Sequence, residues 1–354
     1  MSASLRPSPT SSSTSMASTA HAPLPATPGW KFTPRTPFRP AAGLSNPHSQ
    51  TFFSYFTHPL RGPALVRERW ETPDDDFLDV DRVMAPLHAP HVVLFHGLEG
   101  SSKSGYMLAM LRAAADRGWG AMALNFRSCS GEMNRQLRSY SSGETQDPAF
   151  TLEKLRERGV TGPLFGMGFS LGGNALLKLL AEQGDSSLLS AAVAVSAPFD
   201  LSACAHALDE DSRWGMFYRS FYLRPLHRKA LRKAAAHPGV LDVPRIRRSW
   251  TFREFDDLVT APLHGFKDAE DYWARCSSGP MLERIRRPTL LISSNDDPIA
   301  KVNGALDGLQ NPHLAALLTQ QGGHVGFVSG SILRPRFWAE EVALQFMEER
   351  AGEL

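Results

Sequence analysis

Residues 166–174 read GMGFSLGGN, which places Ser170 between two glycines in the pattern G-x-S-x-G. The bare pattern is weak, because a chain with 28 glycines in 354 residues can produce it by chance. Its context is stronger: the apolar run 163–167 precedes the serine and the helical pattern of 171–184 follows it. Such a strand-to-helix turn raises the hydroxyl above a sheet, with a helix N-terminus beneath it. We therefore interpret Ser170 as a nucleophile and not as part of a structural glycine-rich loop.

Apolar and helical runs alternate along much of the remaining chain. A hairpin is predicted over 64–84, and further buried strands are predicted at 91–95, 120–126, 190–200 and 287–297. Helices are predicted at 105–118, 148–158 and 334–350, and a strand or short helix at 313–324. This alternation predicts an α/β fold with a mostly parallel central sheet and helices on both faces. Residues 201–286 interrupt the rhythm and are predicted to form a helical cap insertion.

A serine hydroxyl becomes a good nucleophile when a base accepts its proton. His324 lies among glycines in QQGGHVGF, after the last predicted strand and before the last helix, where such a base is expected. The carboxylate that orients the base should end a strand between the two. The stretch NDDPI supplies two candidates, Asp296 and Asp297, of which only one can serve because adjacent side chains point in different directions.

The tetrahedral intermediate of acyl transfer needs backbone N–H donors for its oxyanion. One donor should come from the residue after the nucleophile, Leu171, and another from a loop after an earlier strand. The stretch VVLFHGLEGSS fits the second position, with the amide of Leu98 as the expected donor. His96 is then expected to shape this loop, unless His96-Gly97 forms only a turn.

Three other residues have chemistry that needs weighing. Cys129 is a second possible nucleophile, but no histidine is near it in the sequence. Arg127 is expected to brace loops through hydrogen bonds. Asp147, which precedes Pro148, is expected to cap the following helix and to take no part in catalysis.

Seven stretches resemble the YheT-like branch of the α/β-hydrolases, over about residues 44–350. They are NPHSQT (46–51), FHGLEGSSKSGY (95–106), NFRSCSGEMN (125–134), YSSGETQD (140–147), GMGFSLGGN (166–174), NDDPI (295–299) and GGHVGF (322–327). The resemblance implies a serine hydrolase of short- to medium-chain carboxylic esters that needs no metal or organic cofactor. Family patterns place the acid directly before Pro-Ile, which implies Asp297 and makes Asp296 a turn or capping residue. NPHSQT and YSSGE carry Ser where the pattern has Leu and His.

Other acyl substrates stay open: the same three residues could serve a thioesterase, an amidase or a lipase. A binding protein that uses the fold without catalysis is a rival from another class, and a degraded triad would have been its signature. A haloalkane- or epoxide-type hydrolase is excluded, since it needs an acid at position 170.

Composition limits the remaining classes. The net charge of +2 gives no general preference for nucleic acid, and three widely separated cysteines favour a reducing compartment, hence a cytoplasmic protein.

Residues 1–43, rich in Ser, Thr, Pro and Ala, are predicted to be a disordered extension, with organelle targeting as an alternative. No apolar run reaches the roughly 18 residues of a membrane span. Residues 224–250 hold eight Lys or Arg and one acid, Asp242, which suggests either a solvated face or peripheral membrane contact.

Overall fold

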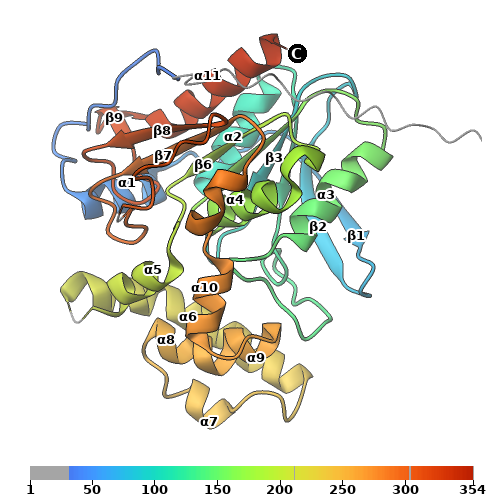
Figure 1. Ribbon diagram of the computed structural model, residues 1–354, viewed down its shortest axis with the longest axis vertical. Coiled ribbons are helices and arrows are strands. Elements are labelled where there is room, and N and C mark those ends of the chain that lie inside the picture. Colours follow the sequence, from blue (N-terminus) through green and yellow to red (C-terminus); the bar gives the residue numbers. More distant parts are fainter. Residues whose placement is uncertain (1–31, 211, 303, 354) are drawn as a thin grey trace, which may run out of the picture.

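The computed structural model describes residues 32–210, 212–302 and 304–353 (Figure 1). Its centre is an eight-stranded sheet with the order β1-β2-β4-β3-β5-β6-β7-β8. Strand β2 is antiparallel to both of its neighbours, whereas β4, β3, β5, β6, β7 and β8 all run parallel. The strands are β1 (Val66–Glu71), β2 (Phe77–Val83), β3 (His91–Phe95), β4 (Gly120–Leu124), β5 (Leu164–Phe169), β6 (Ala191–Val195), β7 (Thr289–Ser294) and β8 (Leu314–Thr319).

Both faces of the sheet are buried, as the continuous apolar strands require. In β3, Val93 and Phe95 point into one core, while Val92 and Leu94 point into the other, following the two-residue period of a strand. The first core is closed by α3 (Gln146–Glu157) and α4 (Leu171–Gln183), and the second by α2 (Gly105–Ala115) and α11 (Trp338–Gly352). The predicted α/β fold with a mostly parallel sheet is confirmed.

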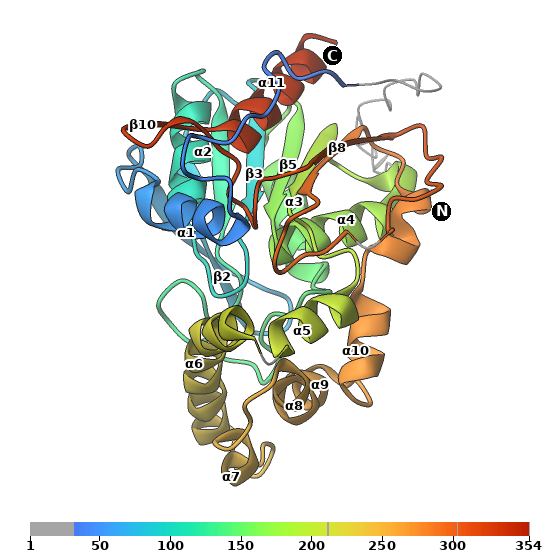
Figure 2. The same cartoon turned by 90° about the vertical axis from the view of Figure 1, so that its left-hand side faces the viewer.

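Between β6 and β7 the chain leaves the sheet and forms a group of helices beyond the carboxyl ends of the parallel strands (Figures 1 and 2). These helices bury an apolar core of their own, built around residues such as Leu223, Ile246 and Trp273. They are α5 (Leu201–Asp209), α6 (Arg213–Ala236), α7 (Val243–Ile246), α8 (Phe252–Phe255), α9 (Ala261–His264) and α10 (Ala269–Cys276). We call this group the cap.

The N-terminal part of the described chain packs against α11. Phe32 is buried against Phe346, and the Nε1 of Trp338 donates to the carbonyl of Thr36 at 2.7 Å. Residues 32–43 therefore belong to the folded body, which corrects the predicted boundary of a disordered extension at residue 43. The rest of that predicted extension, residues 1–31, lies outside the described residues.

Two short elements near the termini were not predicted. Helix α1 (Pro47–Thr57) precedes the sheet, and the hairpin of β9 (Val328–Ser331) and β10 (Arg334–Phe337) follows it. The predicted C-terminal helix consequently begins at Trp338 and not at residue 334. No helix within the described part of the chain is long and apolar enough to cross a bilayer.

Candidate active site

Ser170 occupies the turn between β5 and α4 with a strained backbone, at φ 51° and ψ −122°. A non-glycine residue with positive φ costs about 1–3 kcal/mol and is retained where surrounding structure enforces it. Glycines make room for the turn: a Cβ on Gly168 would lie 2.3 Å from the carbonyl of Gly172, and one on Gly172 would lie 2.4 Å from that of Phe95. The sequence GFSLGG therefore builds a strained strand-to-helix turn with the geometry expected of a nucleophile elbow.

His324 reaches the serine from the loop after β8. Its Nε2 lies 2.8 Å from the Oγ of Ser170. The loop is fixed on both sides of the ring, because the His324 amide donates to the Oγ1 of Thr51 in α1 and the Val325 amide donates to the Oγ of Ser196. Helix α1 thus supports the position of a residue that is far away in the sequence.

Asp297 lies behind the histidine, in the loop after β7. Its Oδ2 and Oδ1 lie 2.9 and 3.1 Å from the Nδ1 of His324. The carboxylate is buried, and its Oδ1 also accepts the amides of Ile299 and Ala300, each at 2.8 Å. Asp296 instead accepts the Gly323 amide at 2.9 Å. The structure therefore brings Asp297 to the ring and leaves Asp296 as a support for the histidine loop.

The two predicted oxyanion donors border the same cavity as Ser170. Leu171 is the first residue of α4, and Leu98 follows Gly97, whose added Cβ would lie 3.2 Å from the Cβ of Ser170. Among the hydrogen bonds of the described residues, neither the Leu98 nor the Leu171 amide has a protein acceptor. Both N–H groups are thus available to a developing oxyanion.

His96 shapes the loop that carries Leu98, as expected. Burial lowers the pKa of its imidazole to about 4, so the ring is neutral at physiological pH. Its Nε2 accepts the Phe126 amide at 3.1 Å, which places the proton on Nδ1, where it is donated to the Gly97 carbonyl at 2.8 Å. The ring therefore links the ends of β3 and β4 and does not act as a base.

A second set of side chains around this loop was not found from the sequence. The Oε1 of Glu99 accepts the hydroxyl of Tyr140 at 2.7 Å and pairs with the Nζ of Lys229 at 2.8 Å. The Tyr140 hydroxyl accepts the Glu99 amide in turn. Because Lys229 belongs to α6, this network ties the cap to the residue that follows Leu98. The pairing joins residues 130 positions apart, and no local pattern signals it.

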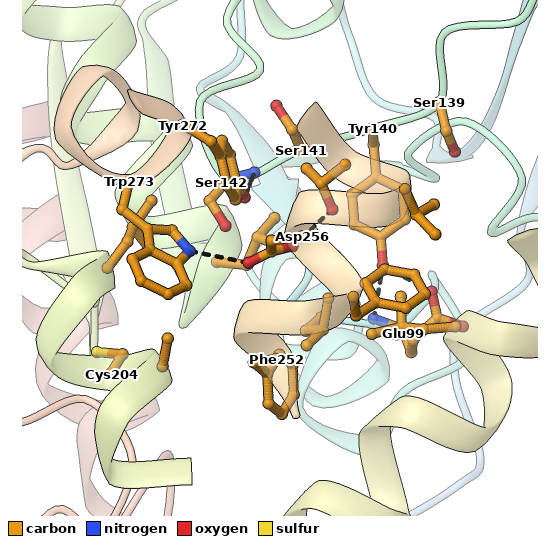
Figure 3. Close-up of a pocket in the computed structure, with 18 of the residues that line it drawn as sticks. Glu99, Ser139, Tyr140, Ser141, Ser142, Cys204, Phe252, Asp256, Tyr272 and Trp273 are labelled. Carbon is orange, nitrogen blue, oxygen red and sulfur yellow. Dashed lines mark hydrogen bonds between the residues drawn. The ribbon is translucent and has the colours of Figure 1, made fainter. Parts of the chain in front are cut away.

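A cavity of about 150 Å³ lies between the strand ends and the cap, and Ser170 opens into it. Its wall is mainly hydrocarbon, although Asp256, Glu99 and several serines (Figure 3), together with Lys229, Lys233 and His264, add polar groups. The apolar lining includes Met133, Leu201, Leu208, Leu226, Phe252, Phe255, Val259, Leu263 and Ile299.

Arg127 braces loops, as expected, through a cluster of carboxylates in which Asp76 and Asp147 are buried and Asp74 is exposed. Its guanidinium contacts Asp147, Asp76 and Asp74 at 2.7–2.9 Å. Burial alone would lower the pKa of Arg127, but the hydrogen bonds to Asp147 and Asp74 outweigh it and raise that pKa, so the group stays charged. The predicted capping role of Asp147 is wrong, because its carboxylate faces Arg127. Glu144 caps α3 instead, by accepting the amides of residues 146 and 147.

The surroundings of Cys129 disfavour the thiolate that a nucleophilic cysteine needs. It is buried, and burial raises the pKa of its thiol to about 11, so it stays protonated at neutral pH. Cys204 and Cys276 are also free and buried. Within the described ranges, no group of three or more His, Cys, Asp or Glu side chains is placed to hold a metal ion.

A serine on such an elbow, with histidine and aspartate behind it at the carboxyl edge of a parallel sheet, defines the class of α/β-hydrolases. The family model described as "alpha/beta hydrolase fold" matches residues 90–331. The chain is 41% identical over 317 residues to the Escherichia coli (strain K12) protein named "Putative esterase YheT", covering 88% of this chain and 92% of that protein. The chain belongs to the YheT-like family of α/β-hydrolases.

More distant relatives carry names of lipid hydrolases. The chain is 29% identical to a "Monoacylglycerol lipase" of Saccharomyces cerevisiae, covering 82% of this chain and 64% of that protein. It is 28% identical to "Phospholipase ABHD3" of Homo sapiens, covering 77% of this chain and 68% of that protein.

Among solved structures, the same fold occurs in an acylaminoacyl peptidase of Pyrococcus horikoshii. It has a TM-score of 0.53 and 17% identity, covering 82% of this chain and 41% of that chain. The esterase Pf2001 of Pyrococcus furiosus has a TM-score of 0.50 and 15% identity, covering 82% and 90%. At these identities the likeness concerns the fold alone.

Proposed function

We propose that this protein is a serine hydrolase that cleaves carboxylic esters of short to medium chain length through an acyl-enzyme on Ser170. The observation that carries the proposal is the continuous contact from Asp297 through His324 to Ser170, with the serine opening into a mainly apolar cavity. A cavity of about 150 Å³ with a hydrocarbon wall suits an acyl chain of limited length.

The mechanism follows from the roles these positions permit. His324 takes the Oγ proton of Ser170 through Nε2, and the oxygen attacks the ester carbonyl. The Leu98 and Leu171 amides donate to the oxyanion, and loss of one such donor typically costs a factor of about 100–1,000 in turnover. Asp297 holds the ring in the tautomer with its proton on Nδ1 and stabilises the imidazolium. His324 then protonates the leaving alcohol, and water releases the acid.

Lipid esters are the leading alternative substrates, because two relatives carry the names of a monoacylglycerol lipase and a phospholipase. Thioesters and amides could be cleaved by the same residues. A binding protein without catalysis is the rival class. It is disfavoured because the serine, its base and the acid are all in contact.

The deciding experiment measures hydrolysis of p-nitrophenyl esters from C2 to C16 by the wild type beside Ser170→Ala. The proposal requires that the wild type turns over and that the variant loses activity by several orders of magnitude. Equal activity in both proteins would remove Ser170 from the mechanism. If no ester is cleaved and a fluorophosphonate probe leaves Ser170 unlabelled, the binding protein becomes the better interpretation.

The proposal includes peripheral contact between the cap and a membrane surface. Helix α6 exposes Trp214 and Phe217 near its start, and its exposed arginines 224, 228 and 232 follow at helical spacing. Phe56 of α1 is 72% exposed. It is connected to these aromatic side chains by Phe52, whose ring contacts both Phe56 and Phe217. Aromatic side chains next to arginines suit the interface of an anionic lipid surface. A cytoplasmic location stays a prediction.

A further inference from the structure

Asp256 is a polar residue in the apolar cap that the proposed mechanism does not use. It begins a π-helical turn (Asp256–Thr260) that joins α8 to α9, and it lines the cavity into which Ser170 opens. Turns of this kind are rare and occur frequently at functional sites. Figure 3 shows the carboxylate in the middle of the lining side chains, between Trp273 and Tyr140, with Tyr272 and Ser142 above it and Phe252 below.

Both carboxylate oxygens of Asp256 are held by neutral donors. Oδ1 accepts the Thr260 hydroxyl at 2.6 Å, and Oδ2 accepts the indole N–H of Trp273 at 2.8 Å. No ion pair among the described residues includes Asp256, although the group is buried. A carboxylate offers about four acceptor positions, so about two remain for another donor. The bonds to Trp273 and Thr260 fix the direction in which these positions point.

The charges that act most strongly on the pKa of Asp256 are those of acids, although Lys229 and Lys233 line the same cavity. Asp209 of α5 and Asp257 in the same turn both add negative charge, while burial is the largest cause that raises the pKa of Asp256 to about 7. The cavity wall includes Phe252, Phe255 and Val259, whose side chains supply no donor. Tyr272 also lies close, but its hydroxyl accepts the Ser142 amide at 3.0 Å, and no hydrogen bond among the described residues joins it to Asp256. A hydrocarbon chain in this part of the cavity would therefore leave the carboxyl group short of hydrogen-bond donors.

We propose that Asp256 forms a polar subsite of the cavity and selects esters that carry a hydrogen-bond donor, a hydroxyl or an ammonium group, on the part that enters the cap. The inference rests on the proposed ester hydrolysis and names its substrate class. A site built to bind a donor discriminates against the analogue that lacks it, because its buried polar group is then left unpaired. We expect donor-bearing esters to be preferred about 10- to 100-fold in kcat/KM.

The test compares p-nitrophenyl hexanoate with its series of hydroxyhexanoates and aminohexanoates, the substituent moved along the chain. Wild type, Asp256→Leu and Asp256→Asn are measured, with Asp257→Asn as the matched control because its carboxylate accepts the Ala269 amide instead. We expect one hydroxy or amino ester to exceed hexanoate about 10- to 100-fold in the wild type and control. Asp256→Leu should cleave the donor-bearing ester no faster than hexanoate. Asp256→Asn should retain more of a preference for a hydroxy ester than of a preference for an amino ester.

Each ratio compares two substrates on one preparation, so partial unfolding of a variant cancels. If Asp256→Leu does not fold, Asp256→Asn decides the question. If the wild type prefers an amino ester, Asp256→Asn should lose that preference. If it prefers a hydroxy ester, Asp256→Asn should lower the ratio of kcat/KM for that ester to kcat/KM for hexanoate. The subsite is overturned if kcat/KM of the wild type for hexanoate equals or exceeds that for every donor-bearing ester. It is also overturned if Asp256→Leu retains the preference for a donor-bearing ester. Failure of the proposed function looks different, since then no ester is cleaved and Ser170→Ala changes nothing.

Discussion

Lys229 of the cap helix α6 and Glu99 of the loop after β3 form an ion pair of 2.8 Å, with both side chains largely buried. Glu99 directly follows Leu98, whose amide is a proposed oxyanion donor. The pair therefore connects a cap helix that lines the cavity to the loop proposed to stabilise the oxyanion.

The first prediction is that Lys229→Met lowers kcat for a p-nitrophenyl ester by about 10- to 100-fold, because a displacement of the loop misplaces the Leu98 amide. The variant also leaves the Glu99 carboxylate without its cation. The double variant Glu99→Gln/Lys229→Met should recover part of the loss, because no charge is then left unpaired. Arg228→Met, at the exposed neighbouring position, is the control. An unchanged kcat in Lys229→Met would show that the ion pair does not position the Leu98 amide.

The second prediction distinguishes the two adjacent aspartates. Asp297→Asn should lower kcat by about 10,000-fold, because an amide facing Nδ1 favours the wrong imidazole tautomer. Asp296→Asn should lower it less than about tenfold, because an asparagine Oδ1 can still accept the Gly323 amide. Steady-state kinetics of the two variants measure this difference directly. Similar losses in both would contradict the assignment of Asp297.

Much of this site could be predicted from the sequence because each part lies beside a recognisable strand. Ser170 follows β5, Asp297 follows β7 and His324 follows β8, so parallel topology alone gathers them at one edge of the sheet. The choice between Asp296 and Asp297 came from family resemblance, and side-chain direction now gives it a physical reason.

The missed features depend on side chains that meet across long sequence distances. Asp147 precedes a proline and has the local signature of a helix cap, yet Arg127 from another loop takes its carboxylate. Lys229 belongs to a basic run that suggested a solvated face or peripheral membrane contact, whereas its ammonium group pairs with Glu99. Helix α1 was missed although the sequence carries a local signal for it. That signal is the capping residue Asn46 followed by Pro47 at the first helical position.

The third prediction concerns the buried cluster around Arg127. Arg127→Met should reduce the free energy of unfolding by about 3–5 kcal/mol, because Asp76 and Asp147 would remain buried without their cation. Urea denaturation measures the change. Arg135→Met should shift the midpoint little, since its partner Glu71 is exposed. Equal shifts in the two variants would argue against a special role of the buried cluster.

The fourth prediction uses the raised pKa of Asp256, which is about 7 against an ordinary value of 3.8. Between these values the folded state binds more protons than the unfolded state, so the contribution of Asp256 to stability is present at low pH and lost as pH rises through 7. The loss amounts to at most about 4 kcal/mol. Asp256→Asn should therefore gain in Tm relative to the wild type from about pH 4 to pH 8. A difference in Tm that stays constant with pH would contradict it.

The last prediction tests the aromatic and arginine face of α6. Co-sedimentation with vesicles of phosphatidylcholine and phosphatidylglycerol should exceed that with phosphatidylcholine alone and should weaken with salt, because each arginine near an anionic surface contributes about 1 kcal/mol. Changing arginines 224, 228 and 232 to glutamine should remove the dependence on phosphatidylglycerol, while the same change at the exposed arginines 245, 247 and 248 should preserve it. Phe217→Ser should weaken binding to both vesicles, because Phe217 is 47% exposed on that face. Equal effects of the two triple variants would show that binding depends on the overall positive charge of the cap and not on this face. If the protein is a dimer that Phe217→Ser dissociates, this face is an interface between two copies of the chain.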